Sequence, residues 1–197
     1  VLQRAPLVSQ TSMVPFMQAF LGLLPLATLL GIRSLPALLG WKTTGEIVGY
    51  GPLLSAVFIL LAPFCFLAGF LFALFCHIWS SSENRQTITF VYVLEGLGAA
   101  AAGIMFALLF VRHLHPIDSA CILLIINMAA AASFLIAHSK RFHGTIAAVV
   151  AVFTAAALFS GSTAKLEALS LKLMWRGLNV VDSKYSPYGN VAFIEDE

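Results

Sequence analysis

The sequence contains few charged residues. Asp, Glu, Lys and Arg make up 10% of its 197 residues, whereas a soluble domain carries roughly 25%. The formal net charge of +2 is too small to indicate nucleic-acid binding. With 60% hydrophobic residues and a mean hydropathy of +0.94, the chain is predicted to be a polytopic membrane protein that contacts the lipid bilayer.

Several common functional motifs are also missing. The three cysteines lie in apolar runs and form neither a CxxC pair nor a haem-attachment motif. Gly45, Gly49 and Gly51 lack the strand and the basic residue of a phosphate-binding loop. The five histidines fall at the ends of apolar runs, which favours interfacial positions over paired haem ligands. The sequence therefore indicates no catalytic residue, no metal-ligand set and no cofactor site.

Apolar runs of bilayer-spanning length recur along the chain. Because a helix rises 1.5 Å per residue, about 20 apolar residues cross a hydrocarbon core of roughly 30 Å. The runs therefore predict an all-α polytopic helix bundle with about five membrane-spanning helices. These are expected at Ser12–Ile32, Val57–Trp79, Ile88–Val111, Ile117–Ala137 and Gly144–Gly161.

One apolar run, Ile47–Trp79, is difficult to assign. As one straight helix it would reach about 50 Å, too long for a single span, yet it is too short for two spans and a loop. Pro52 and Pro63 divide it. We expect an interfacial or re-entrant lead-in up to Ser55, followed by one span. A tight helical hairpin is the alternative, and it would reverse the topology of every later span.

The run Ile88–Val111 has two unlike faces. At about 100° per residue, Leu97 and Leu108 fall on the side expected to meet lipid. Small residues let a neighbouring backbone approach closely, so the other face is expected to pack on Ile117–Ala137 and Gly144–Gly161, or on other membrane subunits. That face holds Gly96, Gly98, Ala99, Ala100, Gly103 and Ala107, together with Glu95.

Glu95 is an acidic residue inside a predicted span. Such a residue is costly in a bilayer, which makes it a candidate for proton or substrate handling. The alternative is a structural carboxyl, protonated or hydrogen-bonded to another helix, with Asn127, Thr154 or Tyr50 as candidate partners. The sequence favours the structural interpretation of Glu95, and Asn127 is the second polar residue placed within a span.

The composition changes after Gly161. Residues 162–177 place leucines and lysines at helical spacing, which predicts an amphipathic helix lying on the membrane surface. Residues 178–197 contain turn-forming residues and a strand pattern at Asn190–Glu195, which predicts the first hairpin of a soluble domain. The chain thus divides into a transmembrane region (1–161), a linker (162–177) and the start of a further domain (178–197).

Basic residues predict the orientation, because they are enriched in cytoplasmic loops. One side of the predicted topology carries more of them than the other, and we place that side and the C-terminus in the cytoplasm. The richer side holds Arg33, Lys42, Arg112, Lys165, Lys172 and Arg176, and the other holds Arg4, Arg85, Lys140 and Arg141.

Three stretches, Gly45–Cys76, Val91–Val111 and Ser183–Glu195, resemble the membrane-embedded spermidine synthase-like proteins of bacteria. The most specific parts are the PxxFLAGFLFAL pattern that begins at Pro63 and the Tyr92–Glu95–Gly96–Gly98–Gly103 pattern. The resemblance implies a membrane region in the bacterial inner membrane, fused to an aminopropyltransferase-like domain with a Rossmann fold. It also implies one or two spans before Val1 and a catalytic-type domain after Glu197.

The resemblance places Tyr185, Tyr188 and Gly189 at the edge of the substrate domain. Soluble spermidine synthases have a tyrosine–glutamine pair there, and its glutamine helps to hold the nucleoside donor. Here the matching pair is Tyr188–Gly189, which is a departure from the family pattern. No catalytic residue of the family falls within this sequence.

Two functions are therefore expected to compete. The first is a membrane module that anchors an aminopropyltransferase-like domain at the cytoplasmic face. The alternative is a non-catalytic integral subunit that packs within a larger electron-transfer or photosynthetic complex. A transporter is a third hypothesis, but the sequence has no clear internal repeat.

Overall fold

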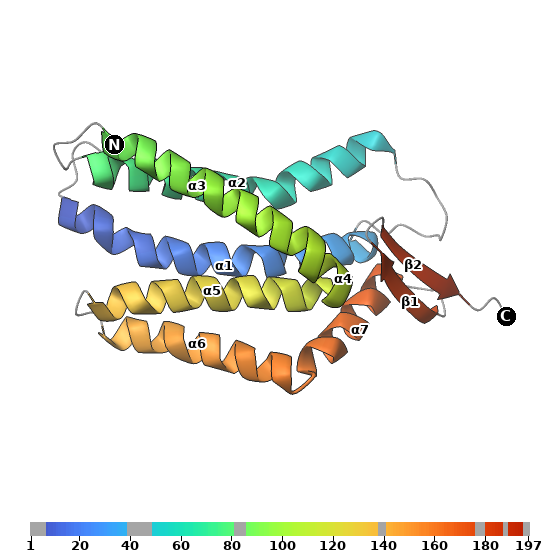
Figure 1. Ribbon diagram of the computed structural model, residues 1–197. Helices are drawn as coiled ribbons and strands as arrows, with labels where there is room; N and C mark the ends of the chain where they lie inside the picture. Colours follow the sequence, from blue (N-terminus) through green and yellow to red (C-terminus); the bar gives the residue numbers. More distant parts are fainter. Residues whose placement is uncertain are drawn as a thin grey trace.

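The computed structural model describes residues 7–38, 49–80, 86–137, 141–175, 180–186 and 189–194. Long helices run side by side along one axis, and a short helix and a β-hairpin follow at one end (Figure 1). The helices are α1 (Leu7–Leu38), α2 (Tyr50–Ser80), α3 (Gln86–Met105), α4 (Val111–His113), α5 (Pro116–Ala137), α6 (Arg141–Phe159) and α7 (Ser162–Met174). A π-helical turn, η2 (Phe106–Phe110), joins α3 to α4.

Five helices in the described part of the chain are long and apolar enough to cross a membrane, as the sequence predicts. Their spanning segments are Met13–Pro36, Tyr50–Ile78, Thr89–His113, Pro116–Ala137 and Phe142–Phe159. The chain is thus a multi-pass helical bundle of the kind that contacts a lipid bilayer.

The ambiguous run before Trp79 forms one continuous helix, α2. The single-span interpretation is therefore confirmed, and the hairpin alternative is wrong. The expected lead-in before Ser55 is the first part of the same helix, although Ile47 and Val48 lie outside the described residues. Pro63 lies inside α2, and the helix changes direction along its length in Figure 1, as a proline kink would cause.

The bundle is built around α1, which contacts α2 and α5, while α5 packs on α6. Val14 of α1 is buried with Leu71 and Leu74 of α2, which forms one apolar cluster. A second cluster joins α5 to α6 through Leu124, Met128, Ala132, Ala147 and Ala151. The core therefore consists of two apolar clusters, one between α1 and α2 and one between α5 and α6.

Glycine permits close approach at Gly22 and Gly144. A Cβ at Gly22 would lie 2.7 Å from the Asn127 Cβ, so no larger side chain fits between α1 and α5 there. A Cβ at Gly144 would lie 2.7 Å from Ile136 Cγ1 and 3.2 Å from the Ala132 carbonyl oxygen. These glycines provide the close backbone contacts that hold membrane helices together.

The helix α3 lies at the margin of the bundle and contacts α2. The ring of Phe72 meets the ring of Tyr92 in a T-shaped arrangement, with centroids 4.9 Å apart. The small-residue face, formed by Gly96, Gly98, Ala99, Ala100, Gly103 and Ala107, is exposed within the described chain.

The predicted packing of this face on α5 and α6 is therefore wrong. A Cβ added at Gly96, Gly98 or Gly103 would meet no described atom within 4 Å. The physical reason is that α1 and α6 already pack against α5. Contact of the small-residue face with other membrane subunits stays a prediction.

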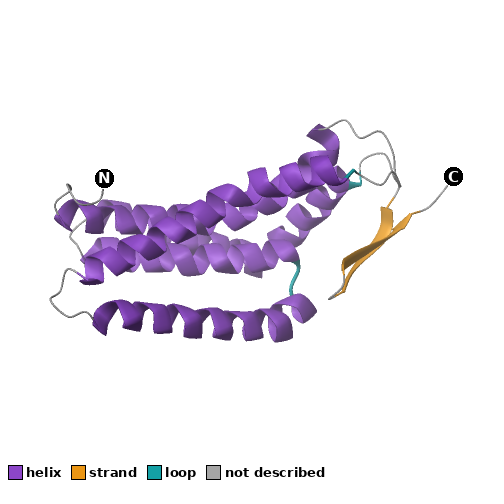
Figure 2. Ribbon diagram, turned by 90° about the horizontal axis from the view of Figure 1, so that it is seen from above, coloured by secondary structure: helices purple, strands orange, loops and turns teal. Residues whose placement is uncertain are grey.

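The predicted hairpin forms at the C-terminal end. Strands β1 (Val180–Ser186) and β2 (Gly189–Ile194) pair antiparallel, with a register irregularity between Val180 and Asp182. Figure 2 shows the pair, in orange, beyond one end of the helices. The Rossmann-like fold to which this hairpin was assigned stays a prediction.

The topology can be tested by cysteine labelling in a background with Cys65, Cys76 and Cys121 replaced. Tyr50→Cys and Thr89→Cys should react from opposite sides of the membrane, because α2 crosses once. Ser162→Cys should react from the same side as Tyr50→Cys, which we expect to be the cytoplasm. A maleimide reagent applied to sealed and inverted vesicles measures this. Labelling of Tyr50→Cys and Thr89→Cys from one side would contradict the five-span topology.

Candidate functional site

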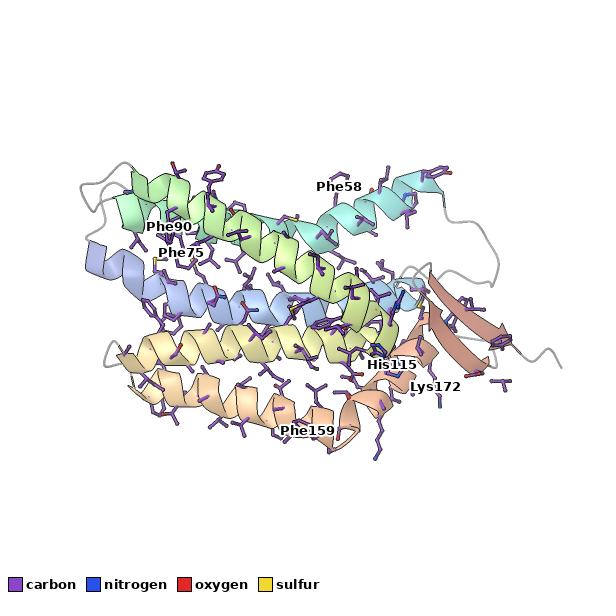
Figure 3. The ribbon with its side chains drawn as sticks, in the orientation of Figure 1. Phe58, Phe75, Phe90, His115, Phe159 and Lys172 are labelled. Atoms are coloured by element: carbon purple, nitrogen blue, oxygen red, sulfur yellow. The ribbon has the colours of Figure 1, made fainter. Side chains whose placement is uncertain are left out.

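A cavity of about 430 Å³ lies between α1, α2 and α3. Two polar side chains line it, Gln18 from α1 and Glu95 from α3. The remaining lining is apolar and includes Phe75, which Figure 3 labels on α2. The apolar residues are Leu21, Ala68, Leu71, Phe72, Phe75, Val91 and Leu94. A cavity of this size with few polar groups is typical of a small-molecule site.

Gln18 is held in place by a hydrogen bond between helices. Its Nε2 donates to Asn127 Oδ1 of α5 at 2.7 Å, and Asn127 Nδ2 donates to the Leu123 carbonyl oxygen at 2.8 Å. Because Asn127 uses its amide group as a donor within α5, its oxygen accepts, and the Gln18 amide group must face it. This chain fixes the orientation of the Gln18 side chain at the edge of the cavity.

None of the three candidate partners bonds to Glu95. Asn127 pairs with Gln18, the Thr154 hydroxyl donates to the Val150 carbonyl oxygen at 2.8 Å, and Tyr50 is 83% exposed at the start of α2. Among the described residues, Glu95 makes no hydrogen bond and no ion pair. Gln18 was not among the predicted site residues, although it is, like Glu95, a polar side chain within a span.

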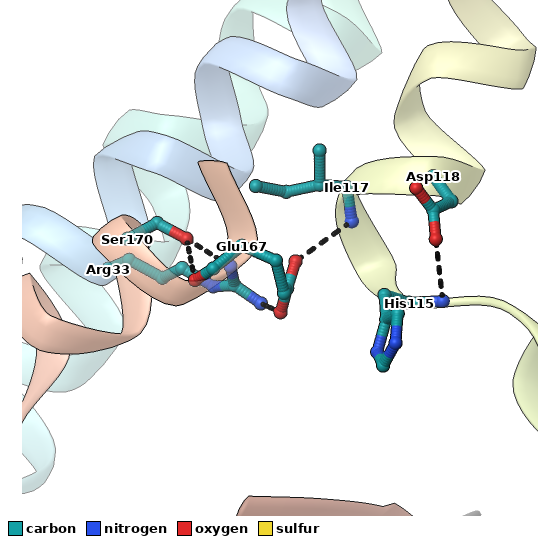
Figure 4. Close-up of polar contacts among 6 residues, drawn as sticks. All are labelled: Arg33, His115, Ile117, Asp118, Glu167 and Ser170. Atoms are coloured by element: carbon teal, nitrogen blue, oxygen red, sulfur yellow. Dashed lines mark hydrogen bonds and ion pairs between the residues drawn. The ribbon is translucent and has the colours of Figure 1, made fainter. Parts of the chain in front are cut away.

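A second polar group lies at the other end of the bundle, where α7 meets α1 and α5 (Figure 4). The Arg33 guanidinium forms an ion pair with Glu167 Oε1 and donates to Ser170 Oγ. The other Glu167 oxygen accepts the Ile117 N–H at 3.4 Å. These side chains are almost wholly buried, with Arg33 4%, Glu167 5% and Ser170 2% exposed.

The position of Glu167 has a clear electrostatic basis. Ile117 is in the first turn of α5, where backbone N–H groups lack helical partners and the helix dipole is positive. A carboxylate placed there is stabilised by the dipole as well as by Arg33. One side chain thus connects three helices, α1, α5 and α7.

The helix α7 forms where the amphipathic helix was predicted. Thr163, Glu167 and Ser170 face the bundle and are buried, whereas Leu166, Leu169 and Leu173 are 38%, 60% and 48% exposed. The helix contacts α1, α5 and α6, and its location on the membrane surface stays a prediction.

The structure also corrects the boundary of the first span. The first span was expected to end at Ile32, but Arg33 lies inside α1, which continues to Leu38. The i, i+4, i+7 spacing of Thr163, Glu167 and Ser170 is a polar stripe that the sequence does carry. This stripe predicts a buried polar helix face only when the cation that pairs with Glu167 is known, and that cation is Arg33 on another helix.

The structure places the other predicted residues separately. Tyr185 lies on β1 opposite Asn190, and Gly189 begins β2 opposite Ser186. Tyr188 lies outside the described residues. The predicted edge of the substrate domain is therefore far along the chain from the cavity that contains Glu95.

A second cavity, of about 320 Å³, lies between α1, the η2 turn and α5. Its lining is apolar apart from Ser119, and Phe106 and Phe110 of the π-helical turn contribute to it. Such turns are frequent at functional sites, but no titratable side chain lines this cavity. The cavity containing Glu95 is thus the better candidate for a site with chemical selectivity.

No protein-family model, curated protein or solved structure matches the chain.

The Arg33–Glu167 ion pair makes a testable prediction about stability. Arg33→Met should lower the free energy of unfolding by about 3–5 kcal/mol, because it leaves a buried carboxylate without its counter-charge. The double variant Arg33→Met/Glu167→Leu should recover most of that loss. Thermal unfolding in detergent measures both variants.

Lys172→Met is the matched control, since Lys172 is an exposed cation on α7, the helix that carries Glu167 (Figure 3). Its effect should be small, as is usual for exposed charges. Equal destabilisation by Arg33→Met and Lys172→Met would show that the pair does not fix α7.

Proposed function

We propose that this chain is the membrane module of a spermidine synthase-like protein. In this proposal it anchors an aminopropyltransferase-like domain at the cytoplasmic face of a bacterial inner membrane. The observation that carries the proposal is the docking of α7 on the bundle through Arg33, Glu167 and Ser170. The hairpin β1–β2 follows this helix in the chain.

A docked helix holds a following domain differently from a flexible linker. A Gly/Ser-rich linker behaves as a random coil and lets the domain tumble, whereas α7 contacts three helices and contributes a buried charge to their junction. A two-stranded hairpin alone is marginally stable in water, so β1 and β2 are expected to pair with further strands. Both points favour a module that sets the orientation of a soluble domain.

The charges at this end of the bundle support a cytoplasmic location. Lys165 and Lys172 are exposed on α7, and Arg112 is exposed at the end of α4. Basic side chains near a membrane are attracted to the anionic lipids of the cytoplasmic leaflet. The end that carries the hairpin therefore has the charge expected of the cytoplasmic side.

The transferase part of the proposal makes its own prediction. A longer product of the same gene should bind decarboxylated S-adenosylmethionine or methylthioadenosine saturably and should turn over putrescine, whereas this chain alone should transfer no aminopropyl group. Gly189 in place of the family glutamine is expected to weaken donor binding, since an amide contact is lost. Calorimetric titration and a product assay measure these. No binding and no turnover in a demonstrably folded sample would contradict the transferase function.

The alternative function is a non-catalytic subunit of a larger membrane complex. The observation that favours it is the exposed small-residue face of α3, where Gly96, Gly98 and Gly103 have open space around them. Lipid chains gain little from a flat small-residue surface, whereas a neighbouring helix can approach it closely. An interface with another subunit would cover this face, which no other part of the described chain packs against at Gly96, Gly98 or Gly103.

Gly103→Leu distinguishes this alternative. It should leave the thermal midpoint of the isolated chain unchanged, because a side chain there meets open space, but it should reduce assembly with any partner. Gly144→Leu is the control and should destabilise the chain itself, since α5 lies against that position. Native electrophoresis of solubilised membranes measures assembly. Unchanged assembly of Gly103→Leu would contradict the subunit function.

A further inference from the structure

We propose that the cavity between α1, α2 and α3 binds an amphiphilic molecule with a single alkylammonium head. The ammonium would meet Glu95 and Gln18, and the alkyl chain would lie along the apolar lining. This site is separate from α7 and the hairpin, so the inference goes beyond the anchoring function and does not depend on it.

Hydrogen-bond accounting shows what kind of head group fits. One N–H of Gln18 Nε2 donates to Asn127, which leaves the second N–H and the carbonyl oxygen of Gln18 for a ligand. An ionised Glu95 carboxylate only accepts hydrogen bonds. An ionised Glu95 therefore requires a ligand that donates, and the Gln18 carbonyl oxygen can accept from the same ligand.

Charge favours an ammonium over a neutral donor. A carboxylate within a membrane span is costly unless it meets a positive charge, and no cation among the described residues pairs with Glu95. Phe72 and Phe75 line the same cavity, and aromatic faces attract cations at short range. An ammonium supplies both the charge and the N–H donors.

The rest of the cavity restricts the ligand to one charge. Apart from Gln18 and Glu95 the lining is apolar, with Leu21, Leu71 and Val91 among its members, and Glu95 is its sole titratable side chain. A second ammonium on the ligand would be desolvated there without a partner, at a large cost. Leu94 and Glu95, which line the cavity, are exposed, so an amphiphile can enter from the bilayer.

The test uses the chain in nanodiscs of zwitterionic lipid and a dodecylamine that carries a photoreactive diazirine. Labelling should be saturable and should map by mass spectrometry to the cavity-lining parts of α1, α2 and α3. Glu95→Gln should raise the concentration for half-maximal labelling by at least about tenfold, because it removes the charge while conserving shape. Asp118→Asn, which removes a carboxylate charge at the other end of the bundle, should change nothing.

Two matched probes separate charge from hydrogen bonding. The dodecanol analogue donates a hydrogen bond without charge, and the dodecyltrimethylammonium analogue carries charge without an N–H donor. Both should label more weakly than the amine. Ala68→Trp, which fills the cavity and leaves Glu95 in place, should abolish saturable labelling in a sample shown to be folded by its thermal transition.

Three results would overturn the proposal. They are labelling that does not saturate, equal half-maximal concentrations for the amine and the alcohol, and an unchanged value for Glu95→Gln. Each of them would leave the docking of α7 untouched, so the anchoring function and the ligand site are tested separately.

Discussion

The buried carboxylate of Glu167 determines how α7 is arranged on α1 and α5 at one end of the bundle. An ion pair removed from water loses hydration, and this loss is compensated only when further hydrogen bonds complete the site. Here Arg33 provides the counter-charge, and the Ile117 N–H of α5 donates to the second oxygen. The position of α7, and hence that of the hairpin after it, depends on α1 reaching Arg33 and on α5 beginning where it does.

The sequence predicted the five spans and the hairpin well, because both depend on local patterns. A span requires a run of apolar residues long enough for the bilayer, and the hairpin follows from turn-forming residues between strand patterns. Even the ambiguous run before Trp79 resolved into the predicted single span, since a helix tolerates Pro63 within the membrane. Span ends were less accurate: the first span was expected to end at Ile32, but α1 continues through Arg33, whose charge meets Glu167.

The contacts between helices were not predictable in the same way. The Arg33–Glu167 bond joins residues 134 positions apart, and the Gln18–Asn127 bond joins residues 109 positions apart. No local pattern specifies such pairs. The same limit explains the glycines: α3 has the most evident small-residue face, yet the close approach occurs at Gly144, where Ile136 and Ala132 of α5 complement it. A helix face of small residues shows that another helix can pack closely there, but it does not identify that helix.

The polar side chains within the bundle differ in whether they have a hydrogen-bond or ion-pair partner. Thr154 bonds within its own helix, Asn127 bonds to Gln18, and Arg33 bonds to Glu167. Glu95 has no such partner among the described residues, and it lies on α3, which packs on α2 and leaves much of its surface open. A ligand that bridges Glu95 and Gln18 would add a contact between α3 and the central helix α1. Because a ligand stabilises the state that binds it, occupancy of this cavity would secure the least packed span of the bundle.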